Sequence, residues 1–460
     1  MNQNNPKTVA FITLGCKVNQ YETDGMAQQL KEAGYTLCSY EEGADVTIIN
    51  TCAVTNMAQR KSRQMMSRAR KKNPNTVLVA AGCYIQNAEK ELEELKEVDM
   101  FLGNNQKNEI VPFLEAYFVN RKETKADNAH SGEKHIIDIN HTSEYEEFSI
   151  ASTKEHTRAY VKIQDGCNQF CSYCIIPYVR GRVRSRKAKE IVKETKNLIA
   201  QGYKEIVLTG IHISSYGVDQ PEEGNLLQLL CRLHDLEGIE RIRLGSLEPR
   251  IITDEFVAQI AQMPKICPHF HLSLQSGADA TLKSMNRHYT TGEYADKVRL
   301  IREYYDNPAV TTDVIVGFPG ETKVDFEQTY DYLNELHLYE MHIFKYSIRE
   351  GTNAAKMPNQ VDGTIKQERS EALLNMTARQ KKAFEEQFLD SQEAVLFEEK
   401  IVIDKEEYYV GHTTRYLKVV VAASVAEEQL KPEQILNQIH AVRLKRHLDN
   451  DHILGELVKN

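Results

Sequence analysis

The chain has 460 residues, a hydrophobic content of 41% and a charged content of 27%, ordinary values for a globular protein of two or three domains. Its net charge of −9 excludes a chain that is basic throughout, so overall charge does not point to nucleic acid. The start of the chain has no basic segment leading into an apolar one, and no run of about 18 apolar residues occurs. Nine cysteines in such a chain favour metal or redox chemistry over disulfides. We therefore expect a soluble, cytoplasmic protein without membrane contact. We also expect it to be a monomer.

The first part of the chain alternates short apolar runs with helical stretches. Strands are predicted at 9–14, 46–50 and 77–81, with a helix near 22–33. Strands that alternate with helices favour a parallel α/β sheet. We place this first domain at 7–120 and interpret the polar stretch 121–150 as a linker.

A second α/β series follows and suggests an open barrel. Helices such as 187–201 and 325–336 separate its strands. Six strands suit a partial (β/α)6 barrel at 151–385, because a complete eight-fold barrel would need more repeats. The predicted strands are 159–163, 205–209, 241–245, 269–275, 311–316 and 340–346.

The last part, 386–457, is predicted to be a small β-barrel. Its strands are short and follow one another closely after a helix that ends near residue 387. They are predicted at 395–397, 400–403, 408–412, 416–422 and 439–444.

The most informative motif is CxxxCxxC, formed by Cys167, Cys171 and Cys174. The spacing is too tight for a disulfide framework and lacks the paired CxxC layout of a structural zinc site. Three thiolates from one loop can hold three irons of a cubane 4Fe–4S cluster and leave the fourth iron open to a ligand. The alternative is three incidental cysteines or a fragment of a zinc site.

A second set of cysteines is spread along the first domain. Cys16, Cys52 and Cys83 each follow a predicted strand, and loops after parallel strands converge at one edge of the sheet. The neighbouring Gly15 and Gly82 allow close approach of the backbone. The pattern leaves two interpretations open: a second iron–sulfur cluster, or three buried and inert cysteines. The remaining cysteines are predicted to be core residues: Cys38, Cys231 and Cys267.

These segments resemble the radical S-adenosylmethionine (SAM) methylthiotransferases over essentially the whole chain. The stretches 15–23 (GCKVNQYET), 50–54 (NTCAV) and 81–83 (AGC) resemble the amino-terminal domain of that family, and 167–182 is similar to its radical SAM core. The carboxy-terminal segment matches the position and size of the family's TRAM domain, an RNA-binding module. The resemblance implies two 4Fe–4S clusters and SAM as cofactors. It also implies a one-electron reductant as a partner.

The stretch 15–23 is most similar to the MtaB branch. That branch acts on N6-threonylcarbamoyladenosine next to the tRNA anticodon and forms its 2-methylthio derivative. The resemblance leaves open the same chemistry on isopentenyladenosine, or on an aspartate of a ribosomal protein. A distant alternative is a non-catalytic iron–sulfur protein that binds RNA or senses redox state.

The resemblance also implies where SAM would bind. SAM would chelate the open iron of the Cys167, Cys171 and Cys174 cluster. Gly210-Ile211-His212 departs from the Gly-Gly-Glu of many radical SAM enzymes, which leaves individual contacts open. Polar groups at the carboxyl ends of barrel strands are where binding residues are expected. The candidate cofactor contacts are Tyr173, Thr209, Gly210, Ser246, Glu248, Ser273, Gln275, Asp313, Gly317 and Phe318.

Basic residues are concentrated beside both cysteine sets. The stretch 53–81 contains seven Lys or Arg and no acidic residue, and 158–190 has a surplus of six positive charges. A solvated helix face would explain one such run, but two runs at one place favour phosphate binding. We therefore predict the tRNA anticodon stem-loop as partner. The candidate contacts are Arg60, Arg63, Arg70, Arg180, Arg182, Arg184, Arg186, Arg443, Lys445 and Arg446.

Overall fold

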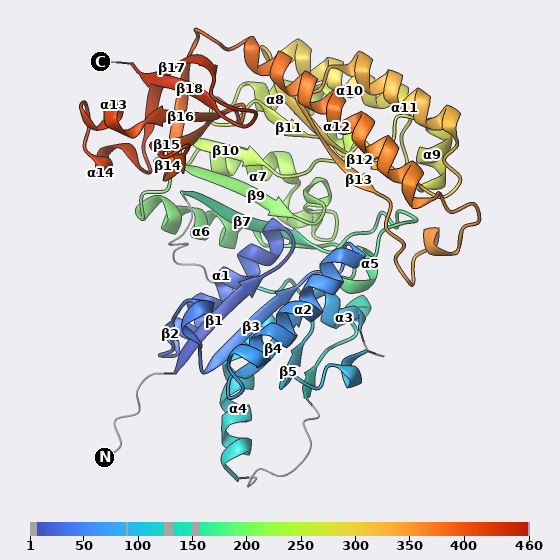
Figure 1. Cartoon of the computed structure of the whole chain (residues 1–460), viewed down its shortest axis with the longest axis vertical. Coiled ribbons are helices and arrows are strands. Elements are labelled where there is room, and N and C mark those ends of the chain that lie inside the picture. Colours follow the sequence, from blue (N-terminus) through green and yellow to red (C-terminus); the bar gives the residue numbers. More distant parts are fainter. Residues whose placement is uncertain (1–6, 89–90, 124–131, 149–156, 459–460) are drawn as a thin grey trace.

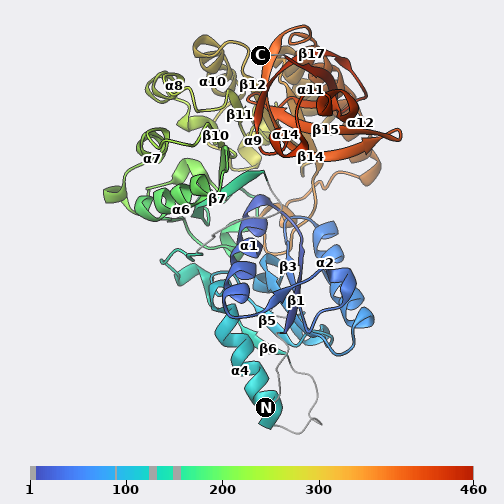
Figure 2. The same cartoon turned by 90° about the vertical axis from the view of Figure 1, so that its left-hand side faces the viewer.

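The computed structural model describes residues 7–88, 91–123, 132–148 and 157–458. It has an α/β architecture with a parallel sheet at the amino terminus, a partial barrel and a closed carboxy-terminal β-barrel, which confirms the predicted fold class. The first sheet lies at one end of the molecule and the C-terminal barrel toward the other (Figures 1 and 2). No helix in the described residues is long and apolar enough to cross a membrane.

The first sheet has the strand order β2-β1-β3-β4-β5-β6, with every pair parallel. The two central strands consist of residues that are all buried, as expected for a sheet covered on both faces. Its strands are β1 Thr8–Thr13, β2 Thr36–Leu37, β3 Val46–Thr51, β4 Val77–Gly82, β5 Met100–Leu102 and β6 Glu133–His135. Its helices are α1 Lys17–Glu32, η1 Tyr40–Glu42, α2 Asn56–Lys72, α3 Cys83–Asn87, η2 Leu92–Glu94, η3 Lys107–Glu109 and α4 Ile110–Glu123.

Part of the predicted linker belongs to this first sheet. Strand β6 pairs with β5, and the short helix η4 (Ile139–His141) follows it. Phe148 is buried and packs edge-on against Tyr21, with ring centroids 6.3 Å apart. The sequence did not predict this strand, because it lies at the edge of the sheet and its side chains are polar. Residues 124–131 and 149–150 lie outside the described residues.

The second domain is an open six-stranded barrel, as predicted. Its parallel strands form two sheets, β10-β9-β7 and β11-β12-β13, joined by bridges such as Leu247 with Leu272. No pairing closes β13 onto β7 in the described residues, and the short strand β8 (Arg184–Ser185) is antiparallel to β7. The strands are β7 Arg158–Asp165, β9 Glu205–Gly210, β10 Arg241–Leu244, β11 His269–His271, β12 Ala309–Val316 and β13 Glu340–Lys345.

Helices cover the outside of this barrel, and the longest, α12, leads toward the C-terminal barrel (Figure 1). The α-helices are α5 Ile176–Val179, α6 Ala188–Ala200, α7 Leu226–His234, α8 Asp254–Ala261, α9 Asp279–Ser284, α10 Thr291–Tyr304, α11 Lys323–Leu336 and α12 Gly363–Glu386. The short 3-10 helices are η5 Ile213–Ser215, η6 Pro221–Glu223, η7 Pro249–Ile251 and η8 Ala354–Lys356.

The C-terminal segment is a closed five-stranded barrel in the order β14-β15-β16-β18-β17. Two predicted strands, 395–397 and 400–403, are one strand with a bulge between Phe397 and Glu399. The last strand was not predicted from the sequence. The elements are β14 Gln392–Ile403, β15 Glu406–Thr413, β16 Lys418–Ala422, α13 Ala423–Glu427, α14 Pro432–Ile435, β17 Ile439–His447 and β18 Ile453–Leu457.

Two arginines of β10 attach this barrel to the second domain. Arg241 donates to the carbonyl oxygens of His412 (3.0 Å) and Ala394 (2.8 Å). Arg243 donates to those of Thr414 (2.9 Å) and Thr413 (3.2 Å). Both guanidinium groups are buried, so the barrel is fixed by charge-assisted hydrogen bonds to its backbone.

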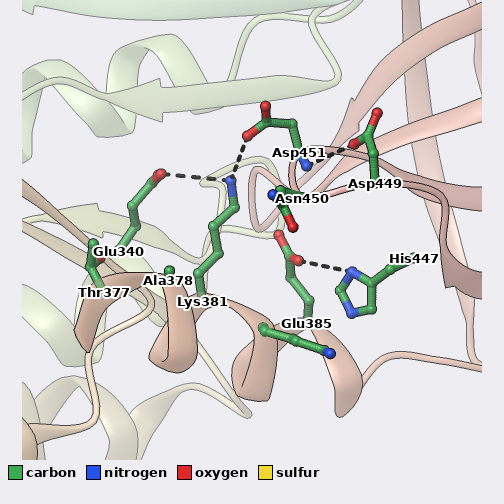
Figure 3. A pocket seen from close by; sticks show the side chains of 10 residues that line it. Glu340, Thr377, Ala378, Lys381, Glu385, His447, Asp449, Asn450 and Asp451 are labelled. Atoms are coloured by element: carbon green, nitrogen blue, oxygen red, sulfur yellow. Dashed lines mark hydrogen bonds and ion pairs between the residues drawn. The ribbon is translucent and has the colours of Figure 1, made fainter. Parts of the chain in front are cut away.

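A cavity of about 370 Å³ lies where α12 meets the C-terminal barrel (Figure 3). The Glu385 carboxylate lies inside it, 3.4 Å from His447 Nδ1, and accepts a hydrogen bond from the Tyr339 hydroxyl at 3.2 Å. Lys381 lies 3.7 Å from both Glu340 and Asp451. Burial raises the pKa of Glu385 to about 7.

We expect Glu385→Gln to reduce the pH dependence of stability. A raised carboxyl pKa means that the folded state holds the proton more tightly, so stability falls as pH rises from about 4.5 to about 7. At about pH 8 the neutral amide avoids burying a charge, and the variant should gain up to about 2 kcal/mol. Thermal unfolding at about pH 5.5 and about pH 8 measures this. The exposed Glu386→Gln is the control, and equal behaviour of the two variants would contradict the assignment.

Candidate active site

The structure brings the three cysteines of the first domain to one edge of the sheet. Cys16 is the N-cap of α1 after β1, Cys52 follows β3, and Cys83 opens α3 after β4. Since β1, β3 and β4 are neighbours and parallel, their carboxyl ends lie together. Gly15 has φ +113°, and a Cβ there would lie 3.1 Å from Cys52 Sγ, so glycine allows these loops to meet.

The surroundings of these cysteines suit an iron–sulfur cluster. Burial, together with the nearby Cys83 and Cys16, raises the pKa of Cys52 to about 11, so this thiol needs a cation to lose its proton. Asn104 Nδ2 donates to Cys83 Sγ at 3.5 Å. No three Cys, His, Asp or Glu side chains in the described ranges are arranged around a single ion. A cubane differs because each thiolate binds a separate iron, and this donor set fits it.

The CxxxCxxC loop lies between β7 and α5 and already has donors directed at its sulfurs. The backbone N–H of Gln169 donates to Cys167 Sγ at 3.4 Å, and Arg287 Nη1 donates to Cys171 Sγ at 3.2 Å. Burial raises the pKa of Cys167 to about 11 and that of Cys174 to about 12. Hydrogen bonds to cluster sulfurs are a usual means of stabilising and tuning such groups, so this set also fits a cluster.

Two predicted cofactor contacts, Tyr173 and Phe318, lie together behind this loop. Their rings pack edge-on with centroids 6.3 Å apart, and Phe318 also contacts Tyr346 at 5.4 Å. Gly317 has φ +69° and donates its N–H to the carboxylate of Glu321 at 2.9 Å. The rings of Tyr173, Phe318 and Tyr346 therefore form one packed aromatic cluster, and contact of Tyr173 and Phe318 with adenine stays a prediction.

Other predicted contacts occupy the carboxyl ends of neighbouring strands. Thr209 and Gly210 end β9, and a Cβ at Gly210 would lie 3.0 Å from the carbonyl oxygen of Gln164. The N–H of Gln275 donates to the carbonyl oxygen of Asp313 at 2.8 Å, which brings these two together. They remain predicted contacts.

Three further residues predicted to contact the cofactor either hydrogen-bond with neighbouring residues or are exposed to solvent. The Ser273 carbonyl accepts a hydrogen bond from the Tyr289 hydroxyl at 2.6 Å. Glu248 accepts from the backbone N–H of Arg250 at 3.1 Å and from its Nε at 2.7 Å, so it caps η7. Ser246 is exposed. Contact of these residues with a cofactor stays a prediction.

The prediction that Arg180, Arg184 and Arg186 contact RNA is wrong for this structure. Each is at most 2% exposed. Arg180 donates to Glu22 and Asp165, and Arg186 donates to Glu194 at 2.5 Å. Arg184 donates to backbone carbonyls. The charge count along 158–190 misled because Glu22 and Glu194, which lie outside that stretch, neutralise Arg180 and Arg186.

The remaining basic candidates differ in exposure. The prediction that Arg70 contacts RNA is also wrong for this structure, because its guanidinium donates to Asp99 and to backbone carbonyls of the same domain. Arg63 pairs with Glu91 at 3.3 Å, and Lys445 pairs with Glu456 at 3.1 Å. The candidates that stay exposed or partly exposed are Arg60, Arg63, Arg182, Arg443, Lys445 and Arg446.

A buried charge network that the sequence did not reveal joins the first two domains. Glu22 of α1 pairs with Lys107, with Lys162 of β7 at 2.8 Å and with Arg180 at 2.7 Å, and Asp165 completes the network. Burial alone would raise the pKa of Glu22, but Arg180 and the two lysines outweigh it and hold the pKa well below its usual range. The only sequence signal was a lysine within the apolar run of β7.

Comparison with known proteins covers nearly the whole chain. Residues 8–103 match the family described as "Uncharacterized protein family UPF0004", and residues 161–333 match the radical SAM superfamily. The chain is 41% identical to the threonylcarbamoyladenosine tRNA methylthiotransferase MtaB of Bacillus subtilis, with 90% of each chain covered. It is 42% identical to the protein of the same name from Aquifex aeolicus, covering 82% of this chain and 90% of that one.

Other relatives agree with these matches. The chain is 38% identical to a tRNA-2-methylthio-N(6)-dimethylallyladenosine synthase of Clostridium botulinum, covering 81% of this chain and 83% of that one. The radical S-adenosylmethionine methyltransferase TsrM of Kitasatospora setae shares the fold, with a TM-score of 0.58 and 15% identity over 76% of this chain and 77% of that one. From the cysteine motifs, the fold and the extent of these matches, we conclude that the chain belongs to the radical SAM methylthiotransferase family.

Proposed function

We propose that this protein converts N6-threonylcarbamoyladenosine next to the tRNA anticodon into its 2-methylthio derivative. The observation that carries the proposal is the convergence of two cysteine triads from different domains, one in a CxxxCxxC loop and one at a sheet edge. Arg180, which follows the CxxxCxxC loop in the chain, reaches Asn19 beside the other triad at 2.7 Å. The choice of substrate is supported by similarity to two proteins named for that nucleoside.

In this proposal each triad has its own task. Membership of the radical SAM superfamily implies SAM and a 4Fe–4S cluster, held here by Cys167, Cys171 and Cys174. When bound, they supply one-electron cleavage of SAM and hence a radical that can take hydrogen from a carbon atom. Cys16, Cys52 and Cys83 would hold a second 4Fe–4S cluster at which the methylthio sulfur is delivered.

The chain's own residues position these groups and exclude water. Gln169 N–H and Arg287 donate to sulfurs of the first triad, and Asn104 donates to one of the second. Tyr173 and Phe318, which pack against one another, would contact the adenine of SAM. Since all six cysteines except Cys16 are buried or partly buried, a substrate base would be held largely away from bulk water.

We further propose the division into a first domain at 7–120, a connection at 121–150 that contributes β6 to the first sheet, a radical SAM core at 151–385 and an RNA-binding barrel at 386–457. The tRNA anticodon stem-loop would lie across the basic candidates that remain accessible, with the backbone phosphates of the RNA as their targets. We propose that the protein acts as a cytoplasmic monomer with a one-electron reductant as partner.

Mass spectrometry of tRNA nucleosides tests the proposal. Cells lacking the gene should accumulate N6-threonylcarbamoyladenosine and lose its 2-methylthio form, and a plasmid copy should restore it. Unchanged methylthiolation of that nucleoside would overturn the substrate assignment. Loss of the methylthio group from isopentenyladenosine instead would favour the activity named for the Clostridium botulinum relative.

A further inference from the structure

Arg349 is a buried arginine with an incomplete set of partners. It follows β13 in the second domain and is 4% exposed. In the described part of the chain no carboxylate lies within ion-pair distance of it, and its Nε is buried without a hydrogen-bond partner. Nη2 donates to Ser347 Oγ at 3.2 Å. Burying a guanidinium without a counter-charge costs free energy of folding. Its presence is therefore explained by a role other than stabilising the fold.

The surrounding contacts hold Arg349 beside the loop of Cys52. Ser347 Oγ also accepts a hydrogen bond at 3.3 Å from the backbone N–H of Asn56, the first residue of α2. Thr352 fixes the other side, because its N–H and hydroxyl donate to the Arg349 carbonyl at 3.1 and 2.7 Å. Burial lowers the pKa of Arg349 to about 10, and Cys52 is the strongest group opposing that shift.

The hydroxyl of Tyr346 gives an independent indication of a missing partner. It is also buried and without a hydrogen-bond partner in the described structure. Tyr346 and Arg349 are close enough to affect one another's pKa. Two unpartnered donors therefore lie close to one another, and one of them, Arg349, lies beside the loop of Cys52. The group that completes them must accept hydrogen bonds and carry negative charge.

We propose that Arg349 supplies the counter-charge of the auxiliary cluster at Cys16, Cys52 and Cys83 and raises its reduction potential. This inference rests on the proposed function, since it requires a second cluster. Three thiolates make such a cluster anionic, and its potential depends on nearby charge, hydrogen bonds and solvent exposure. Arg180 is less suited because Glu22 and Asp165 already neutralise it.

A redox titration of the anaerobically reconstituted holoenzyme, followed by electron paramagnetic resonance, tests the inference. A Cys16, Cys52 and Cys83 triple alanine variant identifies the signal of the first cluster. We expect Arg349→Gln to shift the auxiliary cluster to a more negative potential by at least a tenfold change in its equilibrium, about 59 mV for one electron. Arg349→Lys should shift the potential of the auxiliary cluster less, and the potential of the cluster at Cys167, Cys171 and Cys174 should not change in either variant.

The control is Arg379→Gln, which removes one exposed positive charge from α12. It should leave both potentials unchanged. Loss of the auxiliary cluster from Arg349→Gln but not from Arg349→Lys would also support the inference. Loss from both variants would indicate a packing role and overturn it.

The other anion that could meet Arg349 is the carboxylate of a threonylcarbamoyl group. In that case Arg349→Gln would leave the auxiliary potential unchanged and raise KM for tRNA more than it lowers kcat, which would overturn the inference. Failure of the proposed function is a different result. Wild-type protein would then hold only about four irons and show one cluster signal.

Discussion

Cys167→Ala is expected to abolish the formation of 5′-deoxyadenosine from SAM under strong reductant. One thiolate of the CxxxCxxC loop is lost, and the remaining Cys171 and Cys174 cannot hold three irons. Iron should fall from about eight to about four per chain in anaerobically reconstituted protein. Cys267→Ala is the control, because it removes a buried cysteine that lies outside both triads.

The matching substitution at Cys52 should separate the two triads. Cys52→Ala is expected to lower iron to about four while 5′-deoxyadenosine continues to form at a rate close to that of wild type. Methylthiolated nucleoside should no longer appear. If Cys52→Ala retained about eight irons, the auxiliary cluster would be removed from the mechanism. If wild type formed no 5′-deoxyadenosine, a non-catalytic iron–sulfur protein would be the better description.

Glu22→Ala is expected to lower the free energy of unfolding by about 3–5 kcal/mol, the usual cost of removing one partner of a buried ion network. Lys107, Lys162 and Arg180 would be left with too little negative charge in a site that is at most 1% exposed. Denaturant unfolding measured by circular dichroism gives the free energy. We expect the contact between the first and second domains to be lost before either domain unfolds.

Glu32→Ala provides the matched control, since it removes an exposed carboxylate from the same helix. We expect it to change stability by less than about 0.5 kcal/mol. The double variant Glu22→Ala and Lys162→Met should recover part of the loss, because it removes one of the uncompensated charges. A loss below about 1 kcal/mol for Glu22→Ala would contradict the assigned role of the network.

The sequence predicted those features that depend on local pattern. The triad of Cys16, Cys52 and Cys83 could be located because each of these residues follows an apolar strand, and parallel strands end at the same edge of a sheet. Tyr173 and Phe318 were both predicted as cofactor contacts, and the structure packs them against one another.

The features that the sequence did not predict depend on long-range partners. Arg180 and Arg186 are buried because Glu22 and Glu194 neutralise them, and a count of charges along the chain cannot show such pairs. Strand β6 was missed because its side chains are polar, which an edge strand tolerates. Arg349 gave no local signal, since its importance comes from its position beside Cys52.

The guanidinium bonds from β10 to the C-terminal barrel have a consequence for how a substrate would be selected. Because Arg241 and Arg243 hold backbone carbonyls and not flexible side chains, the barrel has little freedom to swing relative to the second domain. If the barrel binds an RNA, only nucleotides at a fixed distance from the bound segment would therefore reach the active site. The protein would therefore select an adenosine by its distance from the nucleotides bound to the barrel as well as by its chemical modification.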